Sequence, residues 1–457
     1  MKTIAILIHT KVILNNFVTS GAFHELNKNF KCVFLAPELL RESLDGKSYF
    51  YSSSINENGL VAKIRFHLDF LSMKRYESRS STFPIKFYSL YFKELSTIKK
   101  LLAKVLSMPL IYEFIARIFE FCCGCEKKFL DLLDGAAPDL IIIPSGFNDW
   151  TSINFLKCSK KLNIPSFMIM GNWDNVASKG VLRNLPDCMG VWGEQTKHQA
   201  MDIHSMPEKN IHILGSPQFD KHYFPDELDR DDFALKNNFK KEIKYFLFLG
   251  IARNRDETSI LKKLDDYIED NKISNVAIIY RPHPWRDKSL NIIGKNFLDV
   301  KFKHVILDPS MKKHFFAMMQ DPENYSPLNY IPDFKYSVEI LQFSEGVIAS
   351  LTTMGLESMI LGKSVLLPIF KDPIFSFSVG DYMKYEHHKC WSKFRHVVIS
   401  SNINNFQDDF LKLIEISQYK EASSEIKDDV LKVVYNDSKK YKYLLSEILT
   451  KKVINLS

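Results

Sequence analysis

Short apolar runs alternate with amphipathic stretches from the start of the chain. Thr3 to His9 and Lys31 to Leu35 predict buried strands, and Ser20 to Asn27 between them suits a helix. Further strand-like runs follow at 139–144, 166–170, 189–192 and 211–215. A succession of strand, helix and strand is typical of a parallel sheet. The pattern therefore predicts a Rossmann-like domain over residues 1–220.

A second series of strands and helices begins after a polar stretch at 221–242, which predicts an interdomain linker. Strands are expected at 245–250, 276–280, 304–307, 346–349 and 364–368, with helices at 256–270, 336–343 and 355–361. The second domain is predicted over residues 243–457. We expect an α/β fold in which two Rossmann-like domains face a central cleft, because ligands of such sheets bind at the carboxyl ends of the strands.

One stretch between the strands of the first domain has a different composition. The chain has 457 residues and a net charge of +7, and residues 61–104 alone hold ten basic side chains against three acidic ones. The stretch is also rich in Phe and Tyr, and it predicts a helical, basic insertion at about 61–130. Basic and aromatic amphipathic segments suit an anionic membrane surface, whereas an ordinary insertion would pack its apolar face on the domain. Without a recognised nucleic-acid-binding motif, this charge does not predict binding to nucleic acid.

The cysteines and the apolar segments indicate the compartment. The seven cysteines include a single CxxC spacing and no second pair, which predicts reduced thiols and no metal site. The first apolar run is too short and too β-branched for a secretory signal. No segment holds 18 uncharged apolar residues, so the sequence predicts no membrane-spanning helix. We expect a cytoplasmic protein, with peripheral association with the inner face of the cell membrane as the alternative.

The run ASLTTMGLESMILGKSVLLP at 349–368 predicts a strand, a turn rich in hydroxyls, a helix and a second strand. Backbone N–H groups and the helix dipole favour a phosphate at such a helix start. The residues expected to hold the donor nucleotide here are Ser350, Thr352, Thr353, Gly355 and Glu357, the last through the hydroxyls of a ribose. The alternative is an ordinary Ser and Thr cap with a solvated Glu.

This run resembles the donor-nucleotide segment of GT-B-fold glycosyltransferases. YRPHPW at 280–285 resembles the R-x-H-P element of bacterial surface-polymer transferases, including the CDP-glycerol glycerophosphotransferase group, and FLFLGIARNRDE at 246–257 resembles the strand and loop that meet the donor phosphates. The order of runs in the N-terminal half is similar to their order in that group: PDLIIIPSG, IPSFMIMGNWDNVASKG, VWGEQTKHQA and IHILGSPQFD. The resemblance implies transfer of a sugar from a nucleotide-activated donor to a cell-surface glycan or lipid-linked acceptor, as in capsule or lipopolysaccharide assembly.

Two further groups of residues suit the donor's phosphates and the acceptor. Arg281 and His283 stand two apart after a strand and could clamp a diphosphate, and Gly250 with Arg253 offers a close backbone approach and charge. A structural role for the Arg281 and His283 pair is the alternative. For the acceptor we expect the polar, aromatic loop at 171–180, through Asn172, Trp173, Asn175 and Lys179, and the alternative is an Asx-rich turn with Trp173 in the core.

Glycosyl transfer requires a general base for the acceptor hydroxyl and positive charge for the departing diphosphate. His9, Asp149 and Asp174 are the candidate bases, and His283 with Arg281 would stabilise the leaving group. No DxD follows a strand, so we expect a reaction that needs neither metal nor cofactor, with the nucleotide sugar as substrate.

Three other functions stay open at this point. The first is a glycerol- or ribitol-phosphate transferase with a CDP-activated donor, and the second is a non-hydrolysing nucleotide-sugar 2-epimerase. The third is a domain that binds glycan or nucleotide without turnover, which the presence of Glu357, Arg281 and His283 disfavours.

Overall fold

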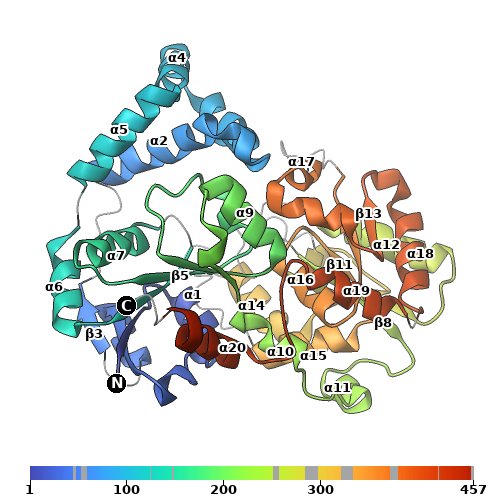
Figure 1. Ribbon diagram of the computed structural model, residues 1–457. Helices are drawn as coiled ribbons and strands as arrows, with labels where there is room; N and C mark the ends of the chain where they lie inside the picture. Colours follow the sequence, from blue (N-terminus) through green and yellow to red (C-terminus); the bar gives the residue numbers. More distant parts are fainter. Residues whose placement is uncertain are drawn as a thin grey trace. The chain divides into compact units, whose positions relative to one another are not determined.

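The computed structural model describes residues 1–44, 48–52, 59–123, 125–146, 149–250, 257–283, 297–320, 333–370, 379–419 and 421–453. The chain forms two compact α/β units (Figure 1). The first comprises Met1–Asp220, Tyr385–His387 and Lys432–Ser457, and the second comprises Lys221–Lys384 and His388–Leu431. Each unit is built on a parallel sheet, which confirms the predicted class of two Rossmann-like domains.

The first unit contains a seven-stranded sheet in the order β3-β2-β1-β4-β5-β6-β7, and all of its strand pairs are parallel. Its strands are β1 (Thr3–Leu7), β2 (Lys31–Pro37), β3 (Ser48–Tyr51), β4 (Leu140–Ser145), β5 (Ser166–Met170), β6 (Cys188–Val191) and β7 (Ile211–Ile213). Its longer helices outside the insertion are α6 (Lys127–Ala136), α7 (Trp150–Lys161) and α9 (Glu194–His204). Every residue of β4 and β5 is buried, as expected for central strands that helices cover on both faces.

The predicted insertion is helical and has a small core of its own. It consists of α2 (Leu60–Arg75), α3 (Thr82–Lys86), α4 (Thr97–Leu106) and α5 (Pro109–Cys122), together with short 3₁₀ and π turns. Phe83, Phe87 and Tyr112 are buried in this core, which also takes in Ala177 and Ile203 of the Rossmann-like part. The insertion is therefore packed on the first unit through part of its apolar surface.

The C-terminal segment returns to the first unit, so the second domain does not extend to residue 457 as expected. The Tyr435 backbone N–H donates to the Trp192 carbonyl at 2.8 Å, and Gly215 has a φ of +69° where a Cβ would lie 2.3 Å from the Tyr435 carbonyl oxygen. Asp220 accepts hydrogen bonds from the backbone N–H of Tyr441, at the start of α20 (Tyr441–Ile448). The aspartate of the G-x-P-x-x-D element thus caps the helix that closes this unit.

The second unit contains a six-stranded sheet in the order β10-β9-β8-β11-β12-β13, also parallel in every pair. Its strands are β8 (Lys244–Leu249), β9 (Val276–Arg281), β10 (Val305–Leu307), β11 (Gly346–Ala349), β12 (Ser364–Pro368) and β13 (Val397–Ser400). Its helices are α11 (Arg230–Lys236), α12 (Thr258–Asp270), α14 (Pro309–Gln320), α15 (Phe334–Phe343), α16 (Thr353–Ile360), α17 (Val379–Met383), α18 (Phe406–Ile416) and α19 (Ala422–Val430). The polar stretch at 221–242, expected as a linker, belongs to this unit and forms α11 and most of α10 (Asp220–Tyr223).

Candidate functional site

Two of the predicted general bases lie side by side in the first unit. His9 follows β1 and Asp149 follows β4, and these strands are neighbours in the sheet. His9 Nε2 lies 3.4 Å from Asp149 Oδ1, and the His9 side chain is 8% exposed. The two residues are 140 positions apart in the sequence, so the strand order is what brings them together.

The Asp149 carboxylate is held in place by its own surroundings. Asp149 caps α7 by accepting a hydrogen bond from the Ser152 backbone N–H at 2.7 Å, and it accepts another from the Ser145 hydroxyl at 2.9 Å. The Nδ1 atom of His9 is buried and has no hydrogen-bond partner among the described residues. A fixed carboxylate beside an imidazole is the arrangement that orients a histidine as a general base.

The loop expected to bind the acceptor divides into buried and exposed residues. Trp173 and Asn175 are 4% and 2% exposed, so they lie inside the fold, as the alternative of an Asx-rich turn implies. The Trp173 ring packs edge-on against His387 at a centroid distance of 5.2 Å. Asn172 and Lys179 are exposed, and Asp174 accepts a hydrogen bond from Ser178 in the same turn. Acceptor binding by this loop and base catalysis by Asp174 stay predictions.

The hydroxyl-rich turn of the second unit forms as the sequence predicts. β11 ends at Ala349, and α16 begins at Thr353 with Thr352 at its N-cap. The Thr352 hydroxyl is buried and makes no hydrogen bond with a described residue. A Cβ at Gly355 would lie 3.0 Å from the Trp391 ring, so this glycine permits close packing beneath the turn. The helix start therefore keeps a hydroxyl and backbone N–H groups available for an anion.

Glu357 has a neighbour that the sequence reasoning missed. His222 Nε2 lies 3.4 Å from Glu357 Oε2, and the two side chains are 5% and 18% exposed. His222 stands two residues after Asp220 of the G-x-P-x-x-D element, and that spacing is the sequence signal that could have marked it. The pair adds a polar group to the predicted ribose site.

Lys363, which follows the predicted donor helix, has a structural role. Its ammonium donates hydrogen bonds to the carbonyl oxygens of Gln342 and Ser344, at 2.8 and 2.6 Å, near the end of α15. Burial lowers the pKa of Lys363 to about 8. The lysine of the Gly-Lys pair thus ties α15 to the strand that follows α16.

Arg281 is buried in an ion pair within the second unit. The side chain is 7% exposed and donates to the Asp308 carboxylate, to Ser310 Oγ at 3.0 Å and to Ser337 Oγ at 3.0 Å. Asp308 also accepts from the Tyr336 hydroxyl at 2.8 Å, and burial raises the pKa of Tyr336. These contacts fit the structural alternative for Arg281, and its role as a phosphate clamp stays a prediction.

Gly250 and His283 meet at the carboxyl ends of β8 and β9. A Cβ at Gly250 would lie 2.9 Å from the His283 backbone nitrogen and 2.9 Å from a carboxylate oxygen of Glu257. Glu257 is buried, accepts a hydrogen bond from the Tyr280 hydroxyl at 2.6 Å, and lines a small void of about 10 Å³ together with Ser350. This packing explains the glycine, while Arg253 lies outside the described residues.

Within the described part of the chain, no group of three or more His, Cys, Asp or Glu side chains is arranged to hold a metal ion. The seven cysteines make no disulfides there. The expectation of a metal-independent reaction remains a prediction.

Comparison with known proteins places the fold. No protein-family model and no curated protein matches the sequence. Among solved structures, the UDP-GlcNAc 2-epimerase of Methanocaldococcus jannaschii has a TM-score of 0.53 and 13% identity over 98% of this chain and 99% of the other. The UDP-GlcNAc 2-epimerase of Neisseria meningitidis bound to UDP-GlcNAc has a TM-score of 0.52 and 13% identity over 99% and 100%. A glycosyltransferase from Rickettsia africae has a TM-score of 0.52 and 9% identity over 99% and 98%.

Identities this low establish the architecture and nothing finer. The matches extend over nearly the full length of both chains and include a glycosyltransferase as well as 2-epimerases. The protein therefore has the two-domain α/β fold of GT-B type that its sequence predicts.

Proposed function

We propose that the protein is a glycosyltransferase that uses a nucleotide-activated sugar. The observation that carries the proposal is the pairing of His9 with Asp149 at the ends of adjacent strands. His9 would take the proton from the acceptor hydroxyl as the sugar is transferred. Asp149 would hold the imidazole and stabilise its charged form.

The donor nucleotide would bind at the start of α16 in the second unit. The backbone N–H groups there and the Thr352 hydroxyl suit the diphosphate, and the Glu357 carboxylate suits the ribose hydroxyls. We propose that the departing diphosphate is stabilised by this helix start without a metal ion. No resident cofactor is needed, because the nucleotide sugar is itself the activated substrate.

Non-hydrolysing 2-epimerisation of a UDP-sugar is the second candidate, and the comparisons favour it. Of the three solved structures compared above, two are UDP-GlcNAc 2-epimerases and one is a glycosyltransferase. This reaction would use the same nucleotide site and would need no acceptor. The requirement for an acceptor therefore distinguishes the two.

A nucleotide panel with a Glu357→Gln variant tests the donor site. Thermal shifts with UDP-, GDP-, CMP- and CDP-linked compounds should show stabilisation by one nucleotide family. Glu357→Gln should weaken binding by about 10- to 100-fold, because hydrogen bonds to a charged group contribute roughly 1.5–3 kcal/mol. Glu415→Gln, at an exposed position of α18, should bind as the wild type does.

The thermal shifts, followed by activity assays with the nucleotide sugar that binds, separate the candidate reactions. UDP release that depends on an added glycan supports transfer, whereas interconversion of two UDP-sugars without acceptor establishes 2-epimerisation. Selective stabilisation by CDP-glycerol would indicate a glycerol-phosphate transferase instead. Binding of no nucleotide, or equal affinity in Glu357→Gln, would contradict the donor site.

We further propose that the acceptor is a glycan or lipid-linked glycan of the cell surface, reached at an anionic membrane. Part of the insertion is apolar and exposed, and we call it the α4–α5 apolar face. It comprises Ile98, Leu101 and Leu102 of α4 and Leu110, Phe114, Ile118 and Phe121 of α5, with Leu110 and Phe121 85% and 89% exposed. No helix in the described ranges is both long and apolar enough to cross a bilayer.

The charges around this face suit anionic lipid. Lys99, Lys104 and Arg117 are exposed on α4 and α5. Both acids of α5 have partners, since Glu113 accepts from the Tyr76 hydroxyl and Glu120 binds Arg183 and Lys157. The exposed charge is therefore mainly basic beside apolar side chains, as a peripheral membrane surface requires.

Co-sedimentation with vesicles tests the membrane proposal. The wild type should pellet with vesicles that contain phosphatidylglycerol. Changing Leu110, Phe114 and Phe121 to Ser should reduce binding by about ten-fold or more, since a buried large apolar side chain contributes roughly 1.5–3 kcal/mol. Leu235→Ser, at a position 72% exposed on α11, is the matched control. A wild type that never pellets would contradict the proposal.

A further inference from the structure

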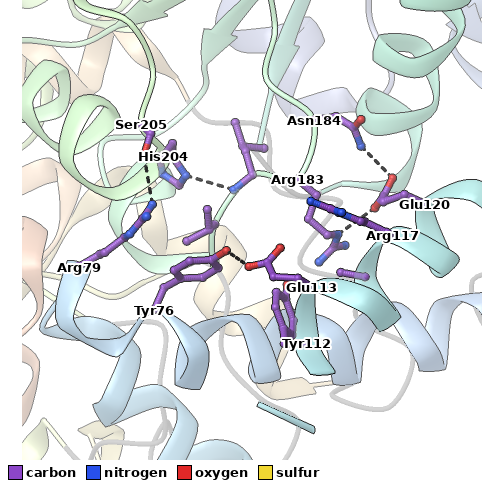
Figure 2. A pocket seen from close by; sticks show the side chains of 13 residues that line it. Tyr76, Arg79, Tyr112, Glu113, Arg117, Glu120, Arg183, Asn184, His204 and Ser205 are labelled. Carbon is purple, nitrogen blue, oxygen red and sulfur yellow. Dashed lines mark hydrogen bonds and ion pairs between the residues drawn. The ribbon is translucent and has the colours of Figure 1, made fainter. Parts of the chain in front are cut away.

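A cavity of about 470 Å³ lies where the insertion meets the Rossmann-like part of the first unit. Figure 2 shows its walls, which come from the turn after α2 (Tyr76 and Arg79), α5, the end of α9 and the segment 181–184. Small-molecule sites typically measure about 300–1,000 Å³, so the cavity has room for more than a lone inorganic anion. None of the residues that the sequence singled out for donor, acceptor or catalysis lines it.

Positive charge exceeds negative charge around this cavity. Arg79, Arg117 and Arg183 line it with Glu113 and Glu120. Asp69 and Lys157 belong to the same network, since Asp69 pairs with Arg183 at 3.0 Å and Lys157 pairs with Glu120. Arg75 lies 3.9 Å from Glu113. Five cations therefore face three carboxylates, and Arg65 adds a further positive charge beside Asp69, so positive charge exceeds negative charge by at least two.

The carboxylates of the network are already engaged. Glu120 accepts from Arg183 Nε at 2.9 Å and from the Asn184 amide at 2.8 Å. Although burial raises the pKa of Glu120, hydrogen bonds from Lys157 and Arg183 hold it below its usual value. Glu113 accepts from the Tyr76 hydroxyl. An anion in the cavity would therefore meet acids whose charge is largely compensated.

Two donors on the cavity wall are unused. The Tyr112 side chain is 2% exposed, and its hydroxyl lies near Ser72 and Arg183 but makes no hydrogen bond of normal geometry with a described residue. Arg117 is exposed and makes no ion pair or hydrogen bond with the described part of the chain. A buried hydroxyl without a partner costs free energy unless a ligand or water satisfies it, so Tyr112 points to an occupant.

Arg79 and His204 line the cavity, but their polar groups form hydrogen bonds within the protein. Arg79 donates to the Ile203 carbonyl at 2.9 Å and to Ser205, as Figure 2 shows for Ser205. His204 accepts from the Leu182 backbone N–H at Nδ1, and its Nε2 lies 2.7 Å from the Val176 carbonyl oxygen. Burial lowers the pKa of His204 to about 4, so it is neutral at pH 7. Among the described residues that line the cavity, Arg117 is the cation left for a ligand.

We propose that this cavity binds a phosphate monoester carried on a sugar or polyol. A monoester dianion matches the excess of two positive charges, and a guanidinium such as that of Arg117 fits phosphate oxygens in pairs. The Tyr112 hydroxyl would donate to the same group. The remaining volume, lined by Asn184, Ser205 and the Tyr76 ring, suits hydroxyl groups. The monoester would come either from a soluble sugar phosphate or from a lipid headgroup held at the membrane.

Calorimetric titration of the full chain with glucose 1-phosphate and with inorganic phosphate tests the site. Glucose 1-phosphate should bind more tightly than inorganic phosphate. Arg117→Gln and Tyr112→Phe should each weaken it by about ten-fold, while Lys160→Gln, which changes an exposed cation of the first unit outside the cavity, should leave it unchanged. Tyr112→Phe should fold normally, because the ring that packs in the insertion is kept and the hydroxyl makes no hydrogen bond of normal geometry with a described residue.

Vesicles distinguish the two sources of the monoester. Arg117-dependent binding to phosphatidic acid, a monoester, with weaker binding to phosphatidylglycerol, a diester, would assign the lipid source. Arg117-dependent binding seen with glucose 1-phosphate and with neither lipid would assign the soluble source. Equal affinities of wild type, Arg117→Gln and Tyr112→Phe for every monoester, or no binding at all, would overturn the proposal.

Discussion

His9→Gln is expected to lower the turnover number by about 10³-fold with little change in donor affinity. General bases contribute roughly 10²- to 10⁴-fold to such reactions, and glutamine keeps hydrogen-bonding capacity without a base of suitable strength. Asp149→Asn should lower turnover by about 10²-fold, because the amide oxygen can still accept the Ser152 N–H that caps α7, while the charge beside the imidazole is lost. Release of nucleotide in the presence of acceptor measures both effects.

The controls for this prediction separate catalysis from folding. His24→Gln changes an exposed histidine of the same unit and should leave turnover unchanged. The thermal stability of His9→Gln should lie close to that of the wild type, because the His9 side chain makes one polar contact with the described residues, the 3.4 Å contact with Asp149. Turnover of His9→Gln within about three-fold of the wild type would refute the assignment of His9 as the base.

The sheets were predictable because their strands are short apolar runs. Ser166–Met170, Gly346–Ala349 and Ser364–Pro368 have the bounds that the sequence suggested. β3 and β13 were missed because their apolar runs, at 49–51 and 397–399, are only three residues long and most of their residues are only partly buried.

The sequence pattern also did not predict that the C-terminal segment, Lys432–Ser457, belongs to the first unit. The apolar face of α20 could cover either unit, and only the tertiary structure shows Tyr441, Leu445 and Leu449 in the core around β1. Gly215 was a sequence signal for this return, because a required glycine often marks a position where another backbone segment approaches closely. The sequence does not say which segment approaches.

The candidate site was predictable in its parts and not in its pairings. His9 and Asp149 were each expected near the end of a strand, but their contact depends on β1 and β4 being neighbours. The polar sequence of the loop suggested that Trp173 and Asn175 face an acceptor; both side chains are buried, and their contact with an acceptor stays a prediction. Residue type indicates which chemistry is possible, and burial decides which atoms are available for it.

Arg281→Gln is expected to destabilise the second unit by about 3–5 kcal/mol. Removing one partner of a buried ion pair leaves the other charge uncompensated, and Asp308 is fully buried. Arg281→Gln with Asp308→Asn should recover most of this loss, because no uncompensated charge then remains. Arg230→Gln, which breaks an exposed pair with Glu345, should cost less than about 1 kcal/mol. Denaturant unfolding measures the three free energies.

The same variants decide between the two roles considered for Arg281. If the double variant regains stability and still binds the nucleotide, the guanidinium serves to neutralise Asp308 and to hold Ser310 and Ser337 beside it. If Arg281→Gln unfolds as the wild type does but loses nucleotide affinity, the ion pair is not needed for stability and the phosphate clamp is the better assignment. Because the arginine is 7% exposed and bonded on both terminal nitrogens, we expect the first result.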